Sequence, residues 1–384
     1  MTPSPSLALV AGEASGDLLA GAVLAACRAR WPQMVCAGIG GPAMQRQGFE
    51  AWWPAQKLSV RGYVEVFAHL PELLSIRHQL KRRILAQPPD VFIGVDAPDF
   101  NLDLEIDLRS AGIPTLHFVS PSFWAWRAEK VHKLRRAADH VLCIFPFEPE
   151  LLRAHDIAAT YVGHPLAQMI EMHPDRAAAR QALGLRPEAT VLALLPGSRQ
   201  AEICHMLPRF LQAIRLLDVQ RKNLQFVMPV LPPLRAQVET MVAQAGFGAS
   251  HGPSLLQVEG RSHEALAACD LALVTSGTAT LEAALFKRPM VIAYHMPWLS
   301  WKIMRRKQLQ PWVGLPNILC GQFVVPELIQ DRATPQALAD ALLSWLDQPD
   351  QCRDVAQRFE QLHQQLRRDT AVLTCDAIEK ILPR

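Results

Sequence analysis

Short apolar runs alternate with stretches of helical periodicity through the first half of the chain. Five runs have the length and composition of buried strands: Leu7–Ala11, Val35–Ile39, Val91–Val95, Thr115–Val119 and Val141–Ile144. The segments between them, such as Pro71–Ala86, place apolar residues three or four positions apart, as on one face of a helix. Apolar strands that alternate with helices predict a parallel sheet covered by helices on both faces.

The same pattern restarts near residue 190, where the clearest strands are Val191–Leu195, Leu224–Met228, Leu271–Thr275 and Met290–Tyr294. We therefore predict an α/β protein of two Rossmann-like domains whose parallel sheets face a central cleft. The N-terminal domain is expected to cover residues 1–170 and the C-terminal domain residues 171–349, with a hinge within 164–190. One long charged helix is expected over Pro349–Leu382, and this C-terminal segment (350–384) is the candidate to complete the N-terminal domain.

Composition narrows the classes of partner and the compartment. The 384 residues carry a formal net charge of +3, which is too mild to favour nucleic acid as the main partner. The eight cysteines form no C-x-x-C pair and no zinc-like spacing, which fits a reducing cytosol. The first residues have the pattern of a strand rather than of a signal peptide, and no apolar run reaches the ~18–20 residues of a membrane span. We expect a protein that is soluble or lies on a membrane surface.

The residues that follow each strand are the candidates for chemistry, because ligands of open parallel sheets bind beyond the carboxyl ends of the strands. Asp96 directly follows Val91–Val95, where a carboxylate could accept a proton from a substrate hydroxyl. Asp99 is the better candidate for a helix cap, because Asp96 is followed by Ala-Pro. We interpret Asp96 as a general base, with a structural role as the alternative.

The first strand leads into the segment Gly12–Asp17, which opens a helix. Its glycines permit a tight turn close to a ligand, and a helix N-terminus favours an anion. The spacing is not G-x-G-x-x-G, so an NAD enzyme is disfavoured. Glu13 is a candidate catalytic residue at this edge. Capping of the helix by Ser15 or Asp17 alone is an equally good interpretation.

A first phosphate-type loop opens the second half at Gly197, Ser198 and Arg199. It combines a glycine turn, a helix start and a guanidinium that can donate two hydrogen bonds to phosphate oxygens. In the alternative interpretation, Glu202 neutralises Arg199.

A second loop of this kind, at Ser276, Gly277 and Thr278, follows another buried strand. Glu282, one turn into the next helix, could accept hydrogen bonds from ribose hydroxyls. The alternative is that Ser276 or Thr278 only caps the helix. Two such loops in one half predict a nucleoside diphosphate ligand, whereas the missing G-x-x-x-x-G-K-[ST] argues against P-loop ATP hydrolysis.

Three further stretches have apolar or aromatic residues beside cations. Trp124 and Trp126 could stack on a sugar, although a place in the core is the preferred interpretation. The other two stretches suit an anionic lipid surface, and inward-packing amphipathic helices are the alternative. Their candidate membrane or acyl-chain contacts are Val64, Val66, Phe67 and Leu70 in one, and Trp298, Trp301, Lys302 and Arg305 in the other.

Six segments stand in a specific order along the chain: GEASGD at 12–17, GVDAPDFN at 94–101, PSFWAW at 121–126, PGSR at 196–199, TSGT at 275–278 and GLPNIL at 314–319. Together they resemble the bacterial lipid-A-disaccharide synthase family. The resemblance extends from about residue 7 to about residue 330, and more loosely to the end.

The resemblance implies a GT-B fold and an inverting glycosyl transfer that needs no metal and no cofactor. The implied donor is UDP-2,3-diacylglucosamine and the acceptor is 2,3-diacylglucosamine 1-phosphate (lipid X). The products are lipid A disaccharide 1-phosphate and UDP. The family's functional positions fall on Glu13, Asp96, Arg199, Glu282 and Asn317, with Asn317 orienting donor or acceptor.

The resemblance also implies a cytoplasmic protein held peripherally at the inner membrane, and it leaves a homodimer open. Two other classes of function remain as alternatives. One is another GT-B enzyme, such as a UDP-N-acetylglucosamine 2-epimerase or the murein N-acetylglucosaminyl transferase. The other is a non-catalytic protein that binds a UDP-sugar or a lipid.

Overall fold

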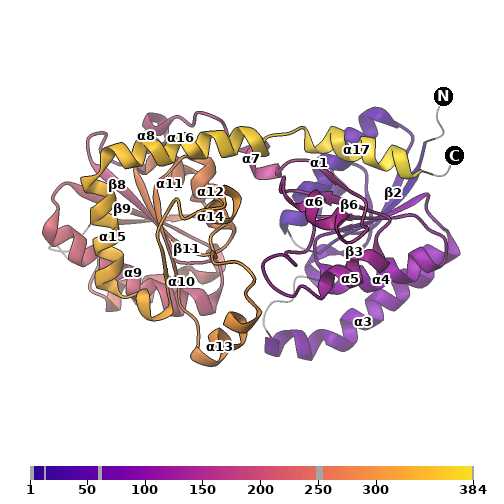
Figure 1. The fold of residues 1–384 in the computed structure, drawn as a ribbon, viewed down its shortest axis with the longest axis horizontal. Helices are drawn as coiled ribbons and strands as arrows, with labels where there is room; N and C mark the ends of the chain where they lie inside the picture. The colour runs from indigo at the N-terminus through magenta and orange to yellow at the C-terminus, as the bar shows by residue number, and fades with distance from the viewer. Residues whose placement is uncertain (1–3, 13, 59–62, 248–253, 383–384) are drawn as a thin grey trace. The chain divides into compact units, whose positions relative to one another are not determined.

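The computed structural model describes residues 4–12, 14–58, 63–247 and 254–382. The chain forms two compact units (Figure 1). Unit 1 consists of Met1–Gln168 and Leu366–Arg384, and unit 2 consists of Met169–Gln365. The C-terminal contribution to unit 1 therefore begins near residue 366 and not near residue 350.

Unit 1 is built on a seven-stranded parallel sheet with the strand order β3-β2-β1-β4-β5-β6-β7. The strands are β1 (Ser6–Ala11), β2 (Val35–Gly40), β3 (Glu50–Pro54), β4 (Val91–Val95), β5 (Thr115–Phe118), β6 (His140–Cys143) and β7 (Ala159–Tyr161). All five strands predicted in this half are present. β3 and β7, which lie at the two edges of the sheet, were not predicted.

Helices cover both faces of this sheet. They are α1 (Ala14–Arg30), α2 (Pro42–Gln45), α3 (Tyr63–Ala86), α4 (Pro98–Ser110), α5 (Lys130–Ala137), α6 (Glu148–Arg153), α7 (Pro165–Met169) and α17 (Thr370–Ile381), with a 3₁₀ turn η1 (Ala55–Lys57). Alternate residues of β1 point to opposite faces. Leu7 and Leu9 join a core cluster with α1 and α17, whereas Ala8 and Val10 join a second cluster with α3 and α4.

Unit 2 repeats this architecture around a six-stranded parallel sheet with the order β10-β9-β8-β11-β12-β13. Its strands are β8 (Thr190–Leu195), β9 (Leu224–Val230), β10 (Leu255–Glu259), β11 (Leu271–Thr275), β12 (Met290–Tyr294) and β13 (Glu327–Ile329). Its helices are α8 (Arg176–Leu183), α9 (Gln200–Gln220), α10 (Arg235–Gln244), α11 (Ser262–Ala268), α12 (Thr278–Leu285), α13 (Trp298–Lys307), α14 (Leu315–Cys320), α15 (Pro335–Asp347) and α16 (Pro349–Leu366). The 3₁₀ turns are η2 (Pro232–Leu234) and η3 (Gln330–Arg332).

The C-terminal segment corrects one prediction, because Pro349–Leu382 is two helices, α16 and α17, and not one. The break has a local cause. Asp369 caps α17 by accepting a hydrogen bond from the Val372 amide at 3.1 Å. Just before it, the Leu366 carbonyl accepts a hydrogen bond from the His164 amide at 2.9 Å, which holds Leu366 within unit 1.

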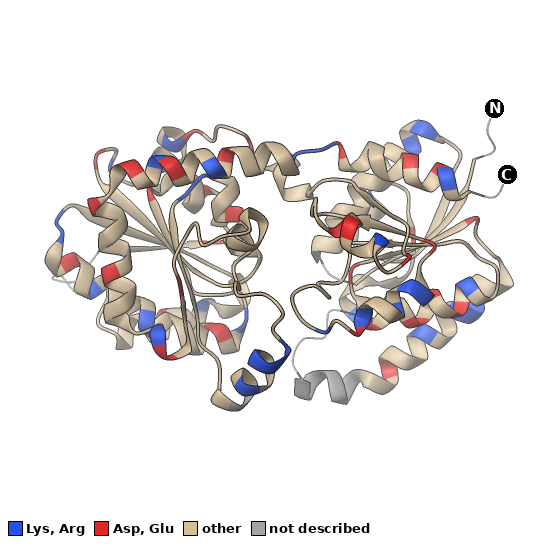
Figure 2. Cartoon of the chain, viewed as in Figure 1, with Lys and Arg blue, Asp and Glu red and all other residues tan. Residues whose placement is uncertain are grey.

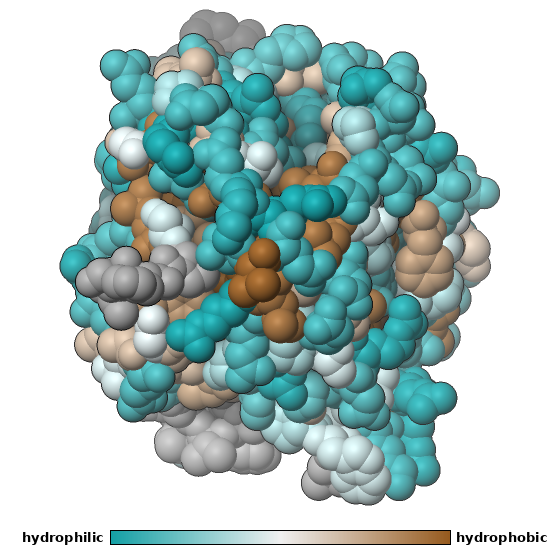
Figure 3. Space-filling model, turned by 90° about the vertical axis from the view of Figure 1, so that its left-hand side faces the viewer, coloured by the Kyte–Doolittle hydropathy of each residue, from teal (hydrophilic) through white to brown (hydrophobic). Residues whose placement is uncertain are grey.

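Apolar surface is interrupted by polar side chains on the face drawn in Figure 3, where brown groups lie among teal ones. In the part of the chain that the structure describes, every helix is too short or too polar to cross a bilayer.

Candidate active site

In unit 1, the chain makes a strained turn where β4 ends. The Asp96 amide donates a hydrogen bond to the Phe118 carbonyl at 2.8 Å, so the turn starts directly at the carboxyl ends of β4 and β5. Asp96 and Ala97 both have left-handed backbone conformations, with φ of 51° and 44°. Such conformations are uncommon outside glycine and are concentrated at functional sites. The half-buried Asp96 thus lies at the carboxyl end of a central strand, as predicted.

The predicted cap at Asp99 is wrong. Ala97 is the N-cap of α4, and its side chain makes no capping hydrogen bond. Asp99 lies in the first turn, where its exposed carboxylate is 2.9 Å from the Lys130 ammonium. Because of the left-handed turn, α4 starts earlier than the sequence suggested. The Asp99 carboxylate in its first turn still interacts favourably with the helix dipole.

Gly12 and Gly16, on either side of Glu13 in the sequence, lie next to the Asp96 turn. A Cβ atom at Gly12 would lie 3.3 Å from that of Ala97, and one at Gly16 would lie 3.7 Å from the Val95 side chain. Glu13 itself is outside the described residues. Asp17 has a separate role, because its buried carboxylate accepts hydrogen bonds from the amides at 41, 43 and 44, at the start of α2.

The two tryptophans after β5 differ in their surroundings. Trp124 is buried and donates a hydrogen bond from Nε1 to Glu148 at 3.0 Å, whereas Trp126 is partly exposed. Burial raises the pKa of Glu148 to about 7, although hydrogen bonds from Trp124 and the backbone oppose the shift. Trp124 is therefore a core residue, as the preferred interpretation predicted.

In unit 2, the first phosphate-type loop joins β8 to α9. Arg199 is the N-cap of α9, and its side chain is 65% exposed. Glu202 accepts hydrogen bonds from the amides of Ser198 at 3.0 Å and Arg199 at 3.3 Å, and it lies 3.5 Å from the Arg199 guanidinium. A bound phosphate would compete with this carboxylate for the same two amides. A Cβ atom at Gly197 would lie 2.5 Å from that of Glu202, so the turn requires glycine.

The second loop of this kind follows β11, the strand next to β8, with Leu195 opposite Val274. Gly277 is the N-cap of α12, with φ of 154°, and makes no side-chain capping bond. Ser276 instead donates a hydrogen bond to the Val313 carbonyl at 3.1 Å. Neither Ser276 nor Thr278 caps α12, so the capping alternative does not account for this loop.

The Glu282 carboxylate lies 3.5 Å from Nε2 of the His263 imidazole. Its side chain is 20% exposed, so a ligand could still reach it. Sequence reasoning overlooked Tyr294, which ends β12. Burial raises the pKa of Tyr294, and the charges of Glu202 and Arg199 also act on it. Tyr294 is the last residue of a predicted strand, so a search limited to the residues after each strand passes over it.

Asn317 is fully buried at the start of α14. Its amide group donates to the Val325 carbonyl at 2.9 Å and to Glu327 at 2.8 Å. Its carbonyl oxygen accepts from the amides of Val324 at 2.8 Å and Val325 at 3.0 Å. These four bonds use the full capacity of an asparagine side chain, so Asn317 acts on the loop around it and has no group left for a substrate.

The structure describes part of the candidate membrane contacts. Val64, Val66 and Phe67 belong to α3, but their side chains are outside the described residues, whereas Leu70 is exposed. On α13, Trp298 is 69% exposed, with the Lys302 ammonium 4.6 Å from its ring. Figure 2 shows the basic residues of α13, and the helix contains no acidic one.

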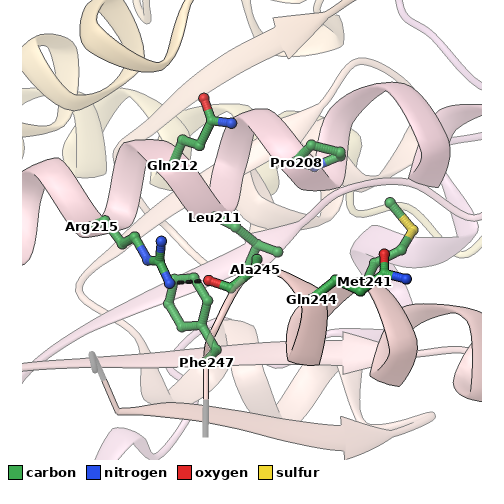
Figure 4. A pocket seen from close by; sticks show the side chains of 8 residues that line it. All are labelled: Pro208, Leu211, Gln212, Arg215, Met241, Gln244, Ala245 and Phe247. Atoms are coloured by element: carbon green, nitrogen blue, oxygen red, sulfur yellow. Dashed lines mark hydrogen bonds between the residues drawn. The ribbon is translucent and has the colours of Figure 1, made fainter. Parts of the chain in front are cut away.

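A cavity of about 270 Å³ lies between α9 and α10, away from the loops described above (Figure 4). Leu211, Met241 and Phe247 form much of its lining, and the Arg215 guanidinium lies 5.0 Å from the Phe247 ring. Arg215 also donates a hydrogen bond to the Ala245 carbonyl. This cavity has no carboxylate or nucleophile for transfer chemistry.

Sequence comparisons single out one family. The model of the lipid-A-disaccharide synthetase family matches residues 7–379. The lipid-A-disaccharide synthase of Albidiferax ferrireducens is 60% identical over 98% of this chain and 97% of its own. The enzyme of the same name from Verminephrobacter eiseniae is 56% identical, with the same coverage.

Solved structures with low sequence identity share the fold. The UDP-GlcNAc 2-epimerase from Neisseria meningitidis, bound to UDP-GlcNAc, has a TM-score of 0.67 at 10% identity and covers 98% of this chain and 99% of its own. MurG from Acinetobacter baumannii has a TM-score of 0.58 at 16% identity, with coverages of 98% and 100%. The architecture of two parallel-sheet, Rossmann-like units is therefore that of GT-B proteins, as predicted.

Proposed function

This chain belongs to the lipid-A-disaccharide synthetase family of glycosyltransferases, and on that premise we propose its substrates and the roles of its residues. The donor is UDP-2,3-diacylglucosamine and the acceptor is 2,3-diacylglucosamine 1-phosphate. The products are UDP and the β-1,6-linked disaccharide 1-phosphate. The observation that carries this proposal is the 60% identity over nearly the whole chain.

Unit 1 supplies the general base. The Asp96 carboxylate takes the proton from the 6-hydroxyl of the acceptor while that oxygen attacks the anomeric carbon of the donor. The new C1–O6 bond forms as the bond from C1 to the diphosphate oxygen breaks, so the anomeric configuration inverts. Glu13, which follows Gly12 in the sequence, orients a substrate hydroxyl.

Unit 2 binds the nucleotide. Arg199 and the amides near Gly277 stabilise the negative charge that grows on the departing UDP. Two glycine turns support this role, because each joins one of the neighbouring strands β8 and β11 to the N-terminus of a helix. Glu282 accepts hydrogen bonds from the ribose hydroxyls. Asn317 contributes indirectly, by fixing the loop that also receives the Ser276 hydrogen bond.

Acylated substrates reach the enzyme at the cytoplasmic face of the inner membrane, to which the protein binds peripherally. α13 supports this proposal, because it combines exposed Trp298 with four cations and no acidic residue. Aromatic and cationic side chains on one short helix are suited to the headgroup region of an anionic bilayer.

The test is incubation of the purified protein with both acylated substrates, followed by mass spectrometry. We expect a disaccharide 1-phosphate and an equal amount of UDP, and neither when one substrate is omitted. UDP-N-acetylglucosamine, which carries an acetyl group but no long acyl chain, serves as the matched control donor. Epimerisation or transfer of this sugar at a comparable rate would contradict the proposed substrates.

A further inference from the structure

Three polar side chains are completely buried behind the Asp96 turn. Asn101 and Glu105 lie one helical turn apart on α4, and His117 lies on the neighbouring strand β5. Each of the three residues has a relative exposure of 0%. Burial of this kind is rare for a carboxylate and an imidazole, because removal from water disfavours polar groups.

Asn101 contacts the turn directly. Its side-chain amide donates a hydrogen bond to the Asp96 carbonyl at 2.8 Å and also lies 3.4 Å from the carbonyls of Val10 and Val95. The Asn101 backbone amide donates to the Ala97 carbonyl at 3.0 Å. The side chain of Asn101 therefore holds Asp96, whereas the bond to Ala97 is the first backbone hydrogen bond of α4. Strained conformations persist only where the surroundings determine them strongly.

Glu105 and His117 hold α4 in the place that this contact requires. The imidazole Nδ1 of His117 lies 2.8 Å from the Glu105 carboxylate, which joins α4 to β5. Gly94, opposite His117 in the sheet, makes the room for this pair. A Cβ atom at Gly94 would lie 2.0 Å from Glu105 Oε1 and 3.0 Å from the Asn101 Cβ. The glycine in β4 thus leaves the space that the polar side chains of α4 occupy.

The hydrogen-bonding capacity of these three side chains is not fully used. Within the ranges that the structure describes, Asn101 Oδ1, Glu105 Oε2 and His117 Nε2 have no hydrogen-bond partner. Apolar residues of similar size would fill the same space without this penalty. A buried polar group, in a place that apolar residues would fill at a lower free-energy cost, is typical of a site under functional constraint.

We propose that Asn101, supported by the Glu105–His117 pair, is a positioning residue for glycosyl transfer. It fixes the backbone of Asp96 and thereby the direction of the Asp96 carboxylate. The proposal rests on the proposed role of Asp96 as the general base. It assigns Asn101 no contact with either substrate, so its removal should affect turnover and leave substrate binding intact.

The test compares Asn101→Ala with Thr115→Val. Thr115 is a matched control, because it is also fully buried and donates a hydrogen bond to the Ala137 carbonyl at 2.7 Å, but it starts β5 at the end of the strand away from Asp96. For Asn101→Ala we expect kcat to fall about 10- to 100-fold, with the donor KM and the UDP Kd within about twofold of the wild type. For Thr115→Val we expect an unchanged kcat below its melting temperature. Equal kcat values for both variants and the wild type would overturn the proposal.

A second comparison tests whether Asn101 acts through Asp96. In an Asp96→Asn background, under single-turnover conditions, Asn101→Ala should lower the rate no further, because residues that act as one unit are not additive. An additional loss of about 10-fold or more would overturn the proposal. If Asp96→Asn alone retains near-normal turnover, the general base is wrongly assigned and the positioning role fails with it. If Asn101→Ala does not fold, Asn101→Ser carries the same two comparisons with the same expected results.

Discussion

At the scale of single residues, backbone conformation separates the roles of Asp96 and Asp99. The sequence favoured Asp99 as the helix cap because aspartate is common there. In the structure that place belongs to Ala97, since Asp96 and Ala97 are both left-handed. Hydrophobic periodicity carries no information on such conformations. The position of the candidate base after β4 could therefore be predicted, and the position of the cap could not.

The same limit applies to buried polar contacts. The four hydrogen bonds of Asn317 and the contact between Trp124 and Glu148 depend on residues that the fold brings together. The family resemblance implied that Asn317 orients donor or acceptor, and a sequence does not show that the hydrogen-bonding groups of this side chain are already used within the fold.

Arg199→Ala should weaken UDP binding. A guanidinium that donates charge-assisted hydrogen bonds to phosphate contributes about 1.5–3 kcal/mol, so we expect a Kd for UDP roughly 10- to 100-fold higher by titration calorimetry. Arg235→Ala is the matched control, because Arg235 is an equally exposed arginine of unit 2 that pairs with Glu239 and Glu259. Equal effects of the two substitutions, or none from Arg199→Ala, would remove Arg199 from the phosphate site.

Glu148→Gln should change how stability depends on pH. Burial raises the pKa of Glu148 from 4.5 to about 7, so the folded state favours the protonated carboxyl. Its stabilising contribution is complete below pH 4.5 and is lost as the pH rises to about 7. Glutamine stays neutral throughout. We therefore expect the unfolding free energy of the wild type to fall by about 3 kcal/mol relative to the variant between about pH 4.5 and 7.5.

Chemical denaturation at several pH values measures this difference. The His164 ring lies 5.6 Å from that of Phe145. Burial lowers the pKa of His164 to about 4, so His164 stabilises the fold above pH 6.5 and loses this contribution as the pH falls. Both proteins contain His164, so its contribution cancels in the difference. A difference that is constant across this pH range would show that Glu148 is ionised in the folded protein.

At the scale of helices and strands, burial explains which elements the sequence predicted. β4, β11 and β12 have the predicted bounds, and almost every residue in them is buried. The unpredicted strands β3, β7, β10 and β13 lie at sheet edges, where the residues are mostly half-buried and the apolar signal is weak. The central strands carry the candidate residues, so the site could be located without the edges.

Binding of α13 to membranes is testable through its charge. Each cation near an anionic surface contributes about 1 kcal/mol, so replacing Lys302, Arg305 and Arg306 with glutamine should weaken vesicle binding by roughly 100-fold. Sedimentation with vesicles that contain phosphatidylglycerol measures the effect. A control protein loses the same charge at three exposed positions of unit 2, namely Lys222, Arg235 and Arg353.

Equal binding by the two substituted proteins would mean that only net charge matters. In that case α13 would have no specific part in membrane contact. Binding that is also insensitive to ionic strength would contradict an electrostatic contribution altogether.

At the scale of the whole molecule, the chain repeats one architecture and gives the two copies different residues at their strand ends. In unit 1 a carboxylate follows β4, whereas in unit 2 glycine turns, hydroxyls and an arginine follow β8 and β11. The fold alone is shared with proteins of other activities, such as an epimerase. It is the order of the loop segments along the chain that made the family recognisable from the sequence.

Asp96→Asn tests most directly whether unit 2 binds the nucleotide and Asp96 of unit 1 performs the proton transfer. Turnover and UDP affinity are measured on the same preparation. We predict a kcat lowered by about 10²- to 10⁴-fold, with the UDP Kd within about twofold of the wild type. Near-normal turnover, or a loss of UDP binding that accounts for the lost activity, would contradict these two roles.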